Sequence, residues 1–325
     1  MKLTSLEREE IAKKRLLKIL DTHAVALMRT LEQKISDAGP FGQRIDPHIL
    51  TKVRNGLIKA GRVIRSDHGN APWFHLAETH KATVQKRLNE QLPIFKALNH
   101  GSLPKRIGQA LEIATYRALL QSGAEFYGRF KDLDAHDDST PYSQEEPPQH
   151  IGMRSLAGDQ RLDFLARHPT AGHLGIECKN VREWIYPDRE EFKELLTKCL
   201  ALDCVPVLIG RRVPYVTYML LTTCGVILHQ TYNQLLPVSE TALADRARDK
   251  LLLGYHDIRL GNEPDKRLLH FISKNLMAIA PDAREKFDAY KDLLAAFAIE
   301  GMPYPEFAAR VRRRSNGQNE DFGPQ

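Results

Sequence analysis

Hydrophobic and polar positions alternate in the middle of the chain, at residues 161–180, RLDFLARHPTAGHLGIECKN. The alternation predicts two strands joined by a turn at residues 168–172, since successive side chains of a strand point to opposite faces. The apolar positions of the second strand fall on one face: Leu174, Ile176 and Cys178. Glu177 and Lys179 then share the other face. Pairing of the two strands would bring Asp163 beside them, so two carboxylates and one ammonium group are predicted to converge.

Such a group of charges has a definite chemical use. Mg²⁺ takes oxygen ligands, often one or two carboxylates, and keeps several water molecules. A bound metal polarises a phosphodiester and lowers the pKa of its water, and a nearby lysine stabilises charge that develops on the phosphate. Asp163, Glu177 and Lys179 are therefore candidate catalytic residues. The motif alone leaves a second interpretation open, a half-buried strand pair with solvated charges on its outer face.

The neighbouring patterns favour the catalytic interpretation. Residues 104–121 and 189–202 have helical periodicity, residues 124–130 form a candidate first strand, and VPVLI at 205–209 is apolar throughout, as a buried strand should be. Glu112 lies in the middle of the first of these helices. The order is helix, strand, strand, strand, helix, strand, with the acidic positions at the ends of the second and third strands.

This order resembles the PD-(D/E)XK nuclease superfamily, which has the restriction-endonuclease-like fold, over about residues 104–236. Asp163 and Glu177-Cys178-Lys179 match its signature, with Leu162 where the family name has proline. The resemblance implies a mixed sheet flanked by helices, and a metal held by Asp163 and Glu177, with Glu112 as an additional ligand. The implied cofactor is Mg²⁺, with Mn²⁺ as a substitute. For Glu112 an exposed helix glutamate remains the alternative.

The first third of the chain predicts helices at residues 3–20, 22–35 and 46–60. Asp46 can cap the third helix, with Pro47 at its first position, and Gly61 suits its end. Residues 37–42 break the helical pattern. Two short β-prone runs, at 62–65 and 73–76, surround a turn at 66–70.

Three helices followed by a β-hairpin resemble a winged helix-turn-helix domain. In such domains the third helix enters the major groove and the wing contacts the DNA backbone. The resemblance implies that the groove-facing residues are His48, Thr51, Lys52, Arg54, Asn55 and Lys59. The implied wing residues are Arg62, Arg65 and His68. Lysine and arginine neutralise phosphates, and arginine and asparagine also read base edges. The alternative is a module used for protein contacts or dimerisation.

The charge distribution agrees with a polyanionic partner. The chain carries +6 overall, but residues 1–100 hold 18 Lys and Arg against 10 Asp and Glu, or +8. Residues 101–325 hold 29 against 31, or −2. The basic excess therefore lies wholly in the first third, which favours double-stranded DNA as its partner. A solvated basic surface without a partner is the alternative.

Composition excludes several classes of protein. The 325 residues are 42% apolar and 27% charged, which is typical of a soluble globular protein. No run approaches the roughly 18 apolar residues of a membrane span, and the N-terminus lacks a secretory pattern. The four cysteines form no CxxC pair, which predicts reduced thiols in a cytoplasmic protein. The sequence has no glycine-rich phosphate loop, so we do not expect a built-in ATP motor.

The expected organisation is α/β (α+β). Its parts are a winged-helix-like DNA-binding domain with a linker helix (1–100), a nuclease-like core (101–237), a helical C-terminal region (238–314) and a disordered tail (315–325). Within the C-terminal region the pattern predicts helices at about 240–253, 265–279, 281–299 and 305–314, with Pro281 at the start of the third. Residues 132–149 are acidic, contain prolines and have few aliphatic residues, so we expect a mobile insertion there.

The function expected from these features is a metal-dependent DNA endonuclease, of a restriction or defence type, that acts as a homodimer. Two alternatives remain at this point. One is a non-catalytic DNA-binding regulator that uses a nuclease-like fold, and the other is a Holliday-junction resolvase.

Overall fold

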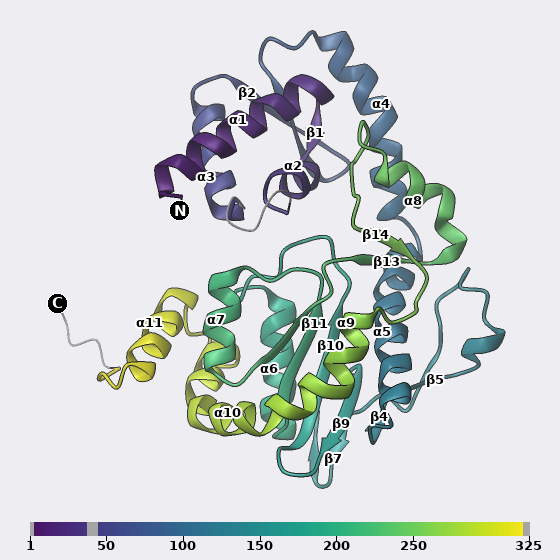
Figure 1. Cartoon of the computed structure of the whole chain (residues 1–325), viewed down its shortest axis with the longest axis vertical. Helices are drawn as coiled ribbons and strands as arrows, with labels where there is room; N and C mark the ends of the chain where they lie inside the picture. Colours follow the sequence, from purple (N-terminus) through teal and green to yellow (C-terminus); the bar gives the residue numbers. More distant parts are fainter. Residues whose placement is uncertain (1–2, 38–44, 321–325) are drawn as a thin grey trace. The chain divides into compact units, whose positions relative to one another are not determined.

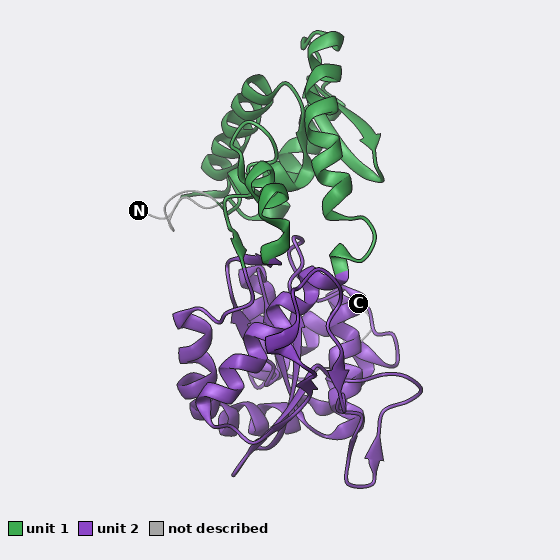
Figure 2. Cartoon of the chain, turned by 90° about the vertical axis from the view of Figure 1, so that its right-hand side faces the viewer, with its two compact units in different colours: residues 1–104, 238–260 green, residues 105–237, 261–325 purple. Residues whose placement is uncertain are grey.

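A computed structural model describes residues 3–37 and 45–320 (Figure 1). The chain divides into two compact units, coloured separately in Figure 2. Unit 1 comprises residues 1–104 and 238–260, and unit 2 comprises residues 105–237 and 261–325. The region expected as one C-terminal helical part, 238–314, is thus shared between the units.

Unit 1 combines helices with a small antiparallel sheet. Its elements are α1 (Ser5–His23), β1 (Ala26–Leu27), α2 (Met28–Ile35), α3 (Pro47–Lys59), β2 (Val63–His68), β3 (Ala71–Leu76), α4 (Lys81–Leu98), α8 (Thr241–Arg248) and β14 (Ile258–Leu260). The strand order is β1-β3-β2. Helix α1 begins with a capping box, in which the Thr4 hydroxyl accepts from the Glu7 amide at 3.3 Å and the Glu7 carboxylate accepts from the Thr4 amide at 2.7 Å.

Several boundaries in unit 1 differ from the predicted ones. The second helix begins at Met28 and not at residue 22, because residues 26 and 27 pair with β3. The hairpin strands extend to His68 and from Ala71, which leaves a tighter turn at Gly69 and Asn70, both with positive φ. Asp46 precedes α3 without capping it through its side chain. Most of the expected breaker at 37–42 lies outside the described residues.

Unit 2 is built on a five-stranded mixed sheet. Its strands are β4 (Phe126–Tyr127), β9 (Phe164–His168), β10 (Gly172–Lys179), β11 (Val205–Gly210) and β12 (Ile227–Gln230). The strand order is β12-β11-β10-β9-β4. Strand β10 runs antiparallel to β9 and parallel to β11, and β12 runs parallel to β11. The expectation of a mixed sheet between helices is confirmed.

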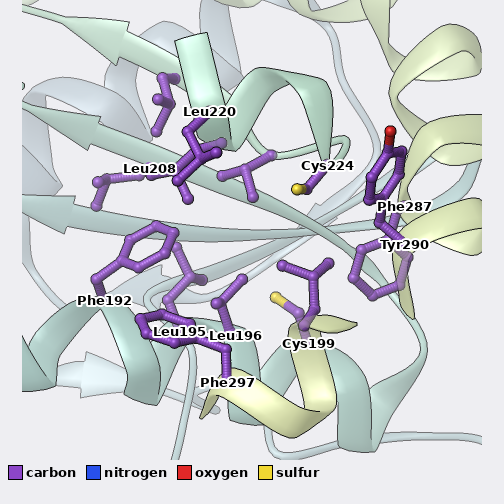
Figure 3. Packing of buried hydrophobic residues seen from close by; sticks show 14 of the residues in the cluster. Phe192, Leu195, Leu196, Cys199, Leu208, Leu220, Cys224, Phe287, Tyr290 and Phe297 are labelled. Atoms are coloured by element: carbon purple, nitrogen blue, oxygen red, sulfur yellow. The ribbon is translucent and has the colours of Figure 1, made fainter. Parts of the chain in front are cut away.

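Helices cover both faces of this sheet. They are α5 (Leu103–Ser122), α6 (Glu190–Leu202), α7 (Tyr215–Thr223), α9 (Lys266–His270), α10 (Leu276–Ala298) and α11 (Tyr304–Ser315). Helices α5 and α9 pack on one face with Ile176, Cys178 and Ile209 of the sheet. Helices α6 and α7 pack on the other face together with the later part of α10, from Phe287 onward, while Leu276 and Ala280 at its start belong to the first face. Figure 3 shows Phe192 and Leu195 of α6 close to Leu208 of β11. All four cysteines are buried free thiols, as expected.

The strand expected at 124–130 is divided by Gly128. Strand β4 pairs with β9, whereas β5 (Arg129–Phe130) pairs with β6 (Gln144–Glu145). Gly128 has φ +105°, and a side chain there would collide with the backbone oxygen of Asp163. The segment 132–149, expected as a mobile insertion, is anchored at Tyr142, which is buried and exchanges two hydrogen bonds of 2.9 Å with the Gln109 side chain.

The C-terminal helices differ most from the prediction. The helices expected at 265–279 and 281–299 form one continuous segment, in which a π-turn (Phe271–Asn275) joins α9 to α10. Pro281 lies inside α10 and leaves the Met277 carbonyl without its helical donor. That carbonyl lies 3.0 Å from His168 Nε2, so the β9–β10 turn supplies a replacement partner. The helix expected at 240–253 ends at Arg248.

Candidate active site

Strand pairing brings the predicted charged residues together. Phe164 is opposite Ile176 in the antiparallel β9–β10 pair, so Asp163, just before β9, lies next to Glu177. The Cys178 amide donates to Asp163 Oδ2 at 2.7 Å, and Gln144 Nε2 donates to the Asp163 carbonyl at 2.9 Å. Two backbone-linked contacts therefore fix Asp163 at the end of β10.

The two faces of β10 are divided as the alternation predicts. Ile176 and Cys178 are buried in the core against α5, where the Cys178 thiol lies 3.3 Å from the Thr115 hydroxyl. On the opposite face Lys179 Nζ lies 3.1 Å from Glu177 Oε2. Glu177 is only 3% exposed, so its charge is stabilised by protein groups more than by solvent.

A second lysine, which was not predicted from the sequence, contacts Glu177. Lys198 of α6 places its Nζ 2.6 Å from Glu177 Oε1. The Lys198 side chain is buried, within the stretch of α6 whose apolar members are Leu195, Leu196, Cys199 and Leu202. A lysine inside an apolar stripe was the available signal, because such a position buries an ammonium group that needs a partner.

Electrostatics link Glu112 to the same group. Burial, followed by the Glu177 carboxylate, raises the pKa of Glu112 to about 7, and Lys179 and Lys105 oppose the shift. Its helix neighbours Leu111, Ala114 and Ala118 pack against the sheet, and Glu112 is half-buried beside them. The position agrees better with a member of the charged cluster than with an exposed helix glutamate.

The remaining charges show the same crowding. Burial raises the pKa of Asp163 well above its ordinary value, and the Glu177 and Glu112 carboxylates add to this, against the Cys178 amide and Lys179. For Lys179 burial alone would lower the pKa, but Glu177 and Asp163 raise it above its ordinary value. The carboxylates of Asp163, Glu177 and Glu112 thus raise one another's affinity for a proton, and Lys179 opposes this.

This donor set fits a hard cation held by few protein ligands. Within residues 3–37 and 45–320, no group of three His, Cys, Asp or Glu side chains has the geometry of a metal site. Mg²⁺ needs only one or two carboxylates, and a carboxylate has about four lone-pair positions, so it can accept from lysine and still coordinate. Asp163 and Glu177, with Glu112 nearby, could therefore hold Mg²⁺ with water completing its shell.

The candidate DNA-binding residues of unit 1 fall into two groups. The exposed ones are His48, Lys52, Asn55, Lys59, Arg62 and Arg65, and Thr51 and His68 are half-buried. Lys52 forms an ion pair of 2.6 Å with Glu9, and Arg65 one of 3.0 Å with Asp67.

Arg54 differs from the other residues of this set. It is half-buried, contacts Met28 Sδ, and lies 5.1 Å from the centroid of the Phe74 ring. Burial lowers its pKa. Part of its guanidinium is thus engaged in packing within unit 1.

Comparisons of this chain with protein-family models, with curated proteins and with solved structures found no match. Among the helices of the described residues, none is long and apolar enough to cross a membrane.

Proposed function

We propose that this chain is a metal-dependent DNA endonuclease of the PD-(D/E)XK type, with a winged-helix-like unit that docks the duplex. The observation that carries the proposal is the convergence of Asp163, Glu177 and Lys179 where β9 begins and β10 ends, at the end of the hairpin away from its turn. A core that served only stability would gain little from this arrangement, since burying two neighbouring carboxylates costs free energy.

Each residue has a distinct role in the proposed reaction. Asp163 and Glu177 would hold the cation, and Glu112 would accept a hydrogen bond from a water of its shell. When bound, Mg²⁺ would polarise the phosphodiester and supply a water of lowered pKa. Lys179 stays protonated, because its pKa is raised, and its ammonium group stabilises the negative charge that builds on the phosphate. Lys198 positions Glu177.

The test is a cleavage assay with Mg²⁺ on linear, supercoiled and branched DNA. Asp163→Asn and Glu177→Gln should each reduce the cleavage rate by about 100-fold or more, since each removes a group that acts at the reacting phosphate. The matched control is Glu145→Gln, an exposed carboxylate on β6. Cleavage that survives both site variants would assign catalysis to other residues.

One observation favours the alternative of a non-catalytic DNA-binding regulator. Both oxygens of Glu177 contact a lysine, at 2.6 and 3.1 Å, which could neutralise the site without a metal. The regulator predicts DNA binding without cleavage under every metal condition. Cleavage confined to the branched substrate would instead select the junction resolvase.

A further inference from the structure

A stack of arginine and tyrosine side chains lies outside the charged cluster in unit 2. The guanidinium carbon of Arg212 is 4.5 Å from the centroid of the Tyr232 ring, and that of Arg267 is 4.9 Å from it. Both distances are within the range of a cation–π contact. One aromatic ring therefore holds two positive charges, an arrangement that attracts an anion.

The backbone places this stack at the same edge of the sheet as Lys179. Lys179 is opposite Gly210 in the parallel β10–β11 pair, and Arg212 follows Gly210 by two residues. The Thr231 amide donates to the Gly210 carbonyl at 2.9 Å, and Tyr232 comes next. The backbone of Lys179 in β10 is two strand spacings of about 4.8 Å, or roughly 10 Å, from the backbone of β12. Helix α9, which carries Arg267, packs through Leu268 on the sheet face of Ile176 and Cys178, and Lys179 lies on the opposite face of β10.

The backbone at Tyr232 is unusual. Its φ is +62°, a left-handed conformation that a bulky residue seldom adopts. Such strain persists where the surroundings hold it, and it is found often at functional sites. The Tyr232 amide donates to the Arg211 carbonyl at 3.2 Å, which helps to hold the conformation. The ring that follows from this backbone contacts the guanidinium groups of Arg212 and of Arg267 in α9.

The two arginines differ in access to solvent. Arg212 is 8% exposed, whereas the Arg267 side chain is 52% exposed. Arg267 donates one hydrogen bond to the Thr231 carbonyl at 3.1 Å and lies 3.7 Å from the Asp265 carboxylate. A guanidinium has five N–H donors in a rigid fork that matches a phosphate. Arg267 can thus bind an external anion while Tyr232 and Arg212 hold it in place.

We infer that Arg267 binds a phosphate of the DNA strand being cut, and that Tyr232 and Arg212 are positioning residues for it. The inference rests on the proposed function for the identity of the ligand. The contact would fix the position of the DNA strand along the edge of the sheet.

The experiment is a salt titration of duplex binding by the full chain without divalent metal. Arg267→Ala should lower the slope of log K against log salt by about 0.9, the value for one lost phosphate contact. The matched control is Lys266→Ala, which removes the same charge from the neighbouring exposed position of α9 and should leave the slope unchanged. An unchanged slope in Arg267→Ala, or an equal fall in both variants, would overturn the inference.

Substitutions of Tyr232 test whether its ring positions Arg267, because they leave the charge of the chain unchanged. Tyr232→Phe keeps the aromatic face and should bind as wild type. Tyr232→Leu keeps a β-carbon at the strained φ but removes the ring, so its slope should approach that of Arg267→Ala. Equal slopes in the two ring variants would show that the stack does not place Arg267.

Cleavage measured in parallel distinguishes the two proposals. If wild type cleaves and Arg267→Ala keeps its salt slope, the inference fails and the endonuclease stands. If the slope depends on Arg267 but wild type never cleaves, the endonuclease fails and the phosphate site stands. A wild-type chain that does not bind DNA at all would refute both.

Discussion

At the scale of single residues, Glu177 is the group around which the charged cluster is arranged. Its carboxylate is almost fully buried, and a buried charge is tolerated only with partners that replace water. Lys179 and Lys198 supply them from β10 and α6. The contact therefore joins the helix to the end of the strand that carries the signature.

Lys198→Met should destabilise the chain by about 3 kcal/mol, because removing one partner of a buried ion pair leaves the other charge poorly compensated. Pairing it with Glu177→Leu should recover most of the loss, since an apolar pair of similar volume replaces the ions. Urea unfolding of the single and double variants measures both effects. Additive losses would show that the two side chains do not interact energetically.

The signature residues could be predicted because they lie on neighbouring strands of one hairpin. Period-two alternation fixes which side chains share a face, and a short turn at 168–172 fixes the pairing of Asp163 with Glu177. Lys198 is 21 residues away in sequence from Glu177, and its contact depends on how α6 packs. Arg54 was predicted to face the DNA groove, but its long side chain packs on the Phe74 ring. The direction of a long side chain depends on its tertiary neighbours, which the helical pattern does not show.

At the scale of elements, predicted boundaries agree where a local residue decides them. Helix α3 starts at Pro47 and is followed by Gly61, whose φ is +67°. The prediction was wrong where a distant group overrides a local signal. Pro281 does not end its helix, because His168 partners the carbonyl that the proline leaves without a donor. Strand β1 was not predicted, because a strand of two residues, Ala26 and Leu27, is too short to show an alternating pattern.

Gly225 makes a testable close contact between elements. It joins α7 to β12 with φ +80°, and a β-carbon there would collide with the backbone of Ala283 and Phe287 in α10. Gly225→Ala should therefore lower the free energy of unfolding by about 3 kcal/mol or more, because its φ is unfavourable for alanine and α10 must move away from the added β-carbon.

Gly152→Ala is the matched control for that prediction. Gly152 also has positive φ, +58°, but no atom lies within 4 Å of an added β-carbon. Gly152→Ala should lower the free energy of unfolding by only about 1–2 kcal/mol, the cost of holding alanine in a left-handed backbone conformation. The urea midpoints of the two variants make the comparison, provided that their denaturant slopes agree. Similar losses would mean that α10 moves aside at little cost.

At the scale of the whole molecule, unit 1 is discontinuous in sequence. Residues 238–260 return to it, and the Thr30 hydroxyl donates to the Leu253 carbonyl at 2.9 Å. Nothing in the composition of this stretch distinguishes it from the helices that follow. It holds four Lys and Arg and four Asp and Glu, so unit 1 keeps the +8 of its first segment. Deleting residues 1–100 would remove most of one compact unit and leave this segment without its partners.

Neutralising surface charges in the full chain is therefore the better test of how unit 1 meets DNA. Lys59 ends α3, Arg62 precedes β2, and both are exposed. If both contact phosphates, Lys59→Gln with Arg62→Gln should lower the slope of log K against log salt by about 1.8, or 0.9 for each contact. Affinity should fall about equally on all sequences, because phosphate contacts position the protein and do not specify bases.

The control replaces two exposed lysines of α4, Lys81 and Lys86, with glutamine. It removes the same charge from the same unit, so long-range attraction falls equally in both double variants, and only direct contact separates them. Binding is measured without divalent metal to prevent cleavage. Slopes that fall together would attribute DNA attraction to the net charge of unit 1. Slopes that both stay at the wild-type value would mean that α3 and the hairpin do not touch the backbone, and unit 1 would then be better interpreted as a protein-contact module.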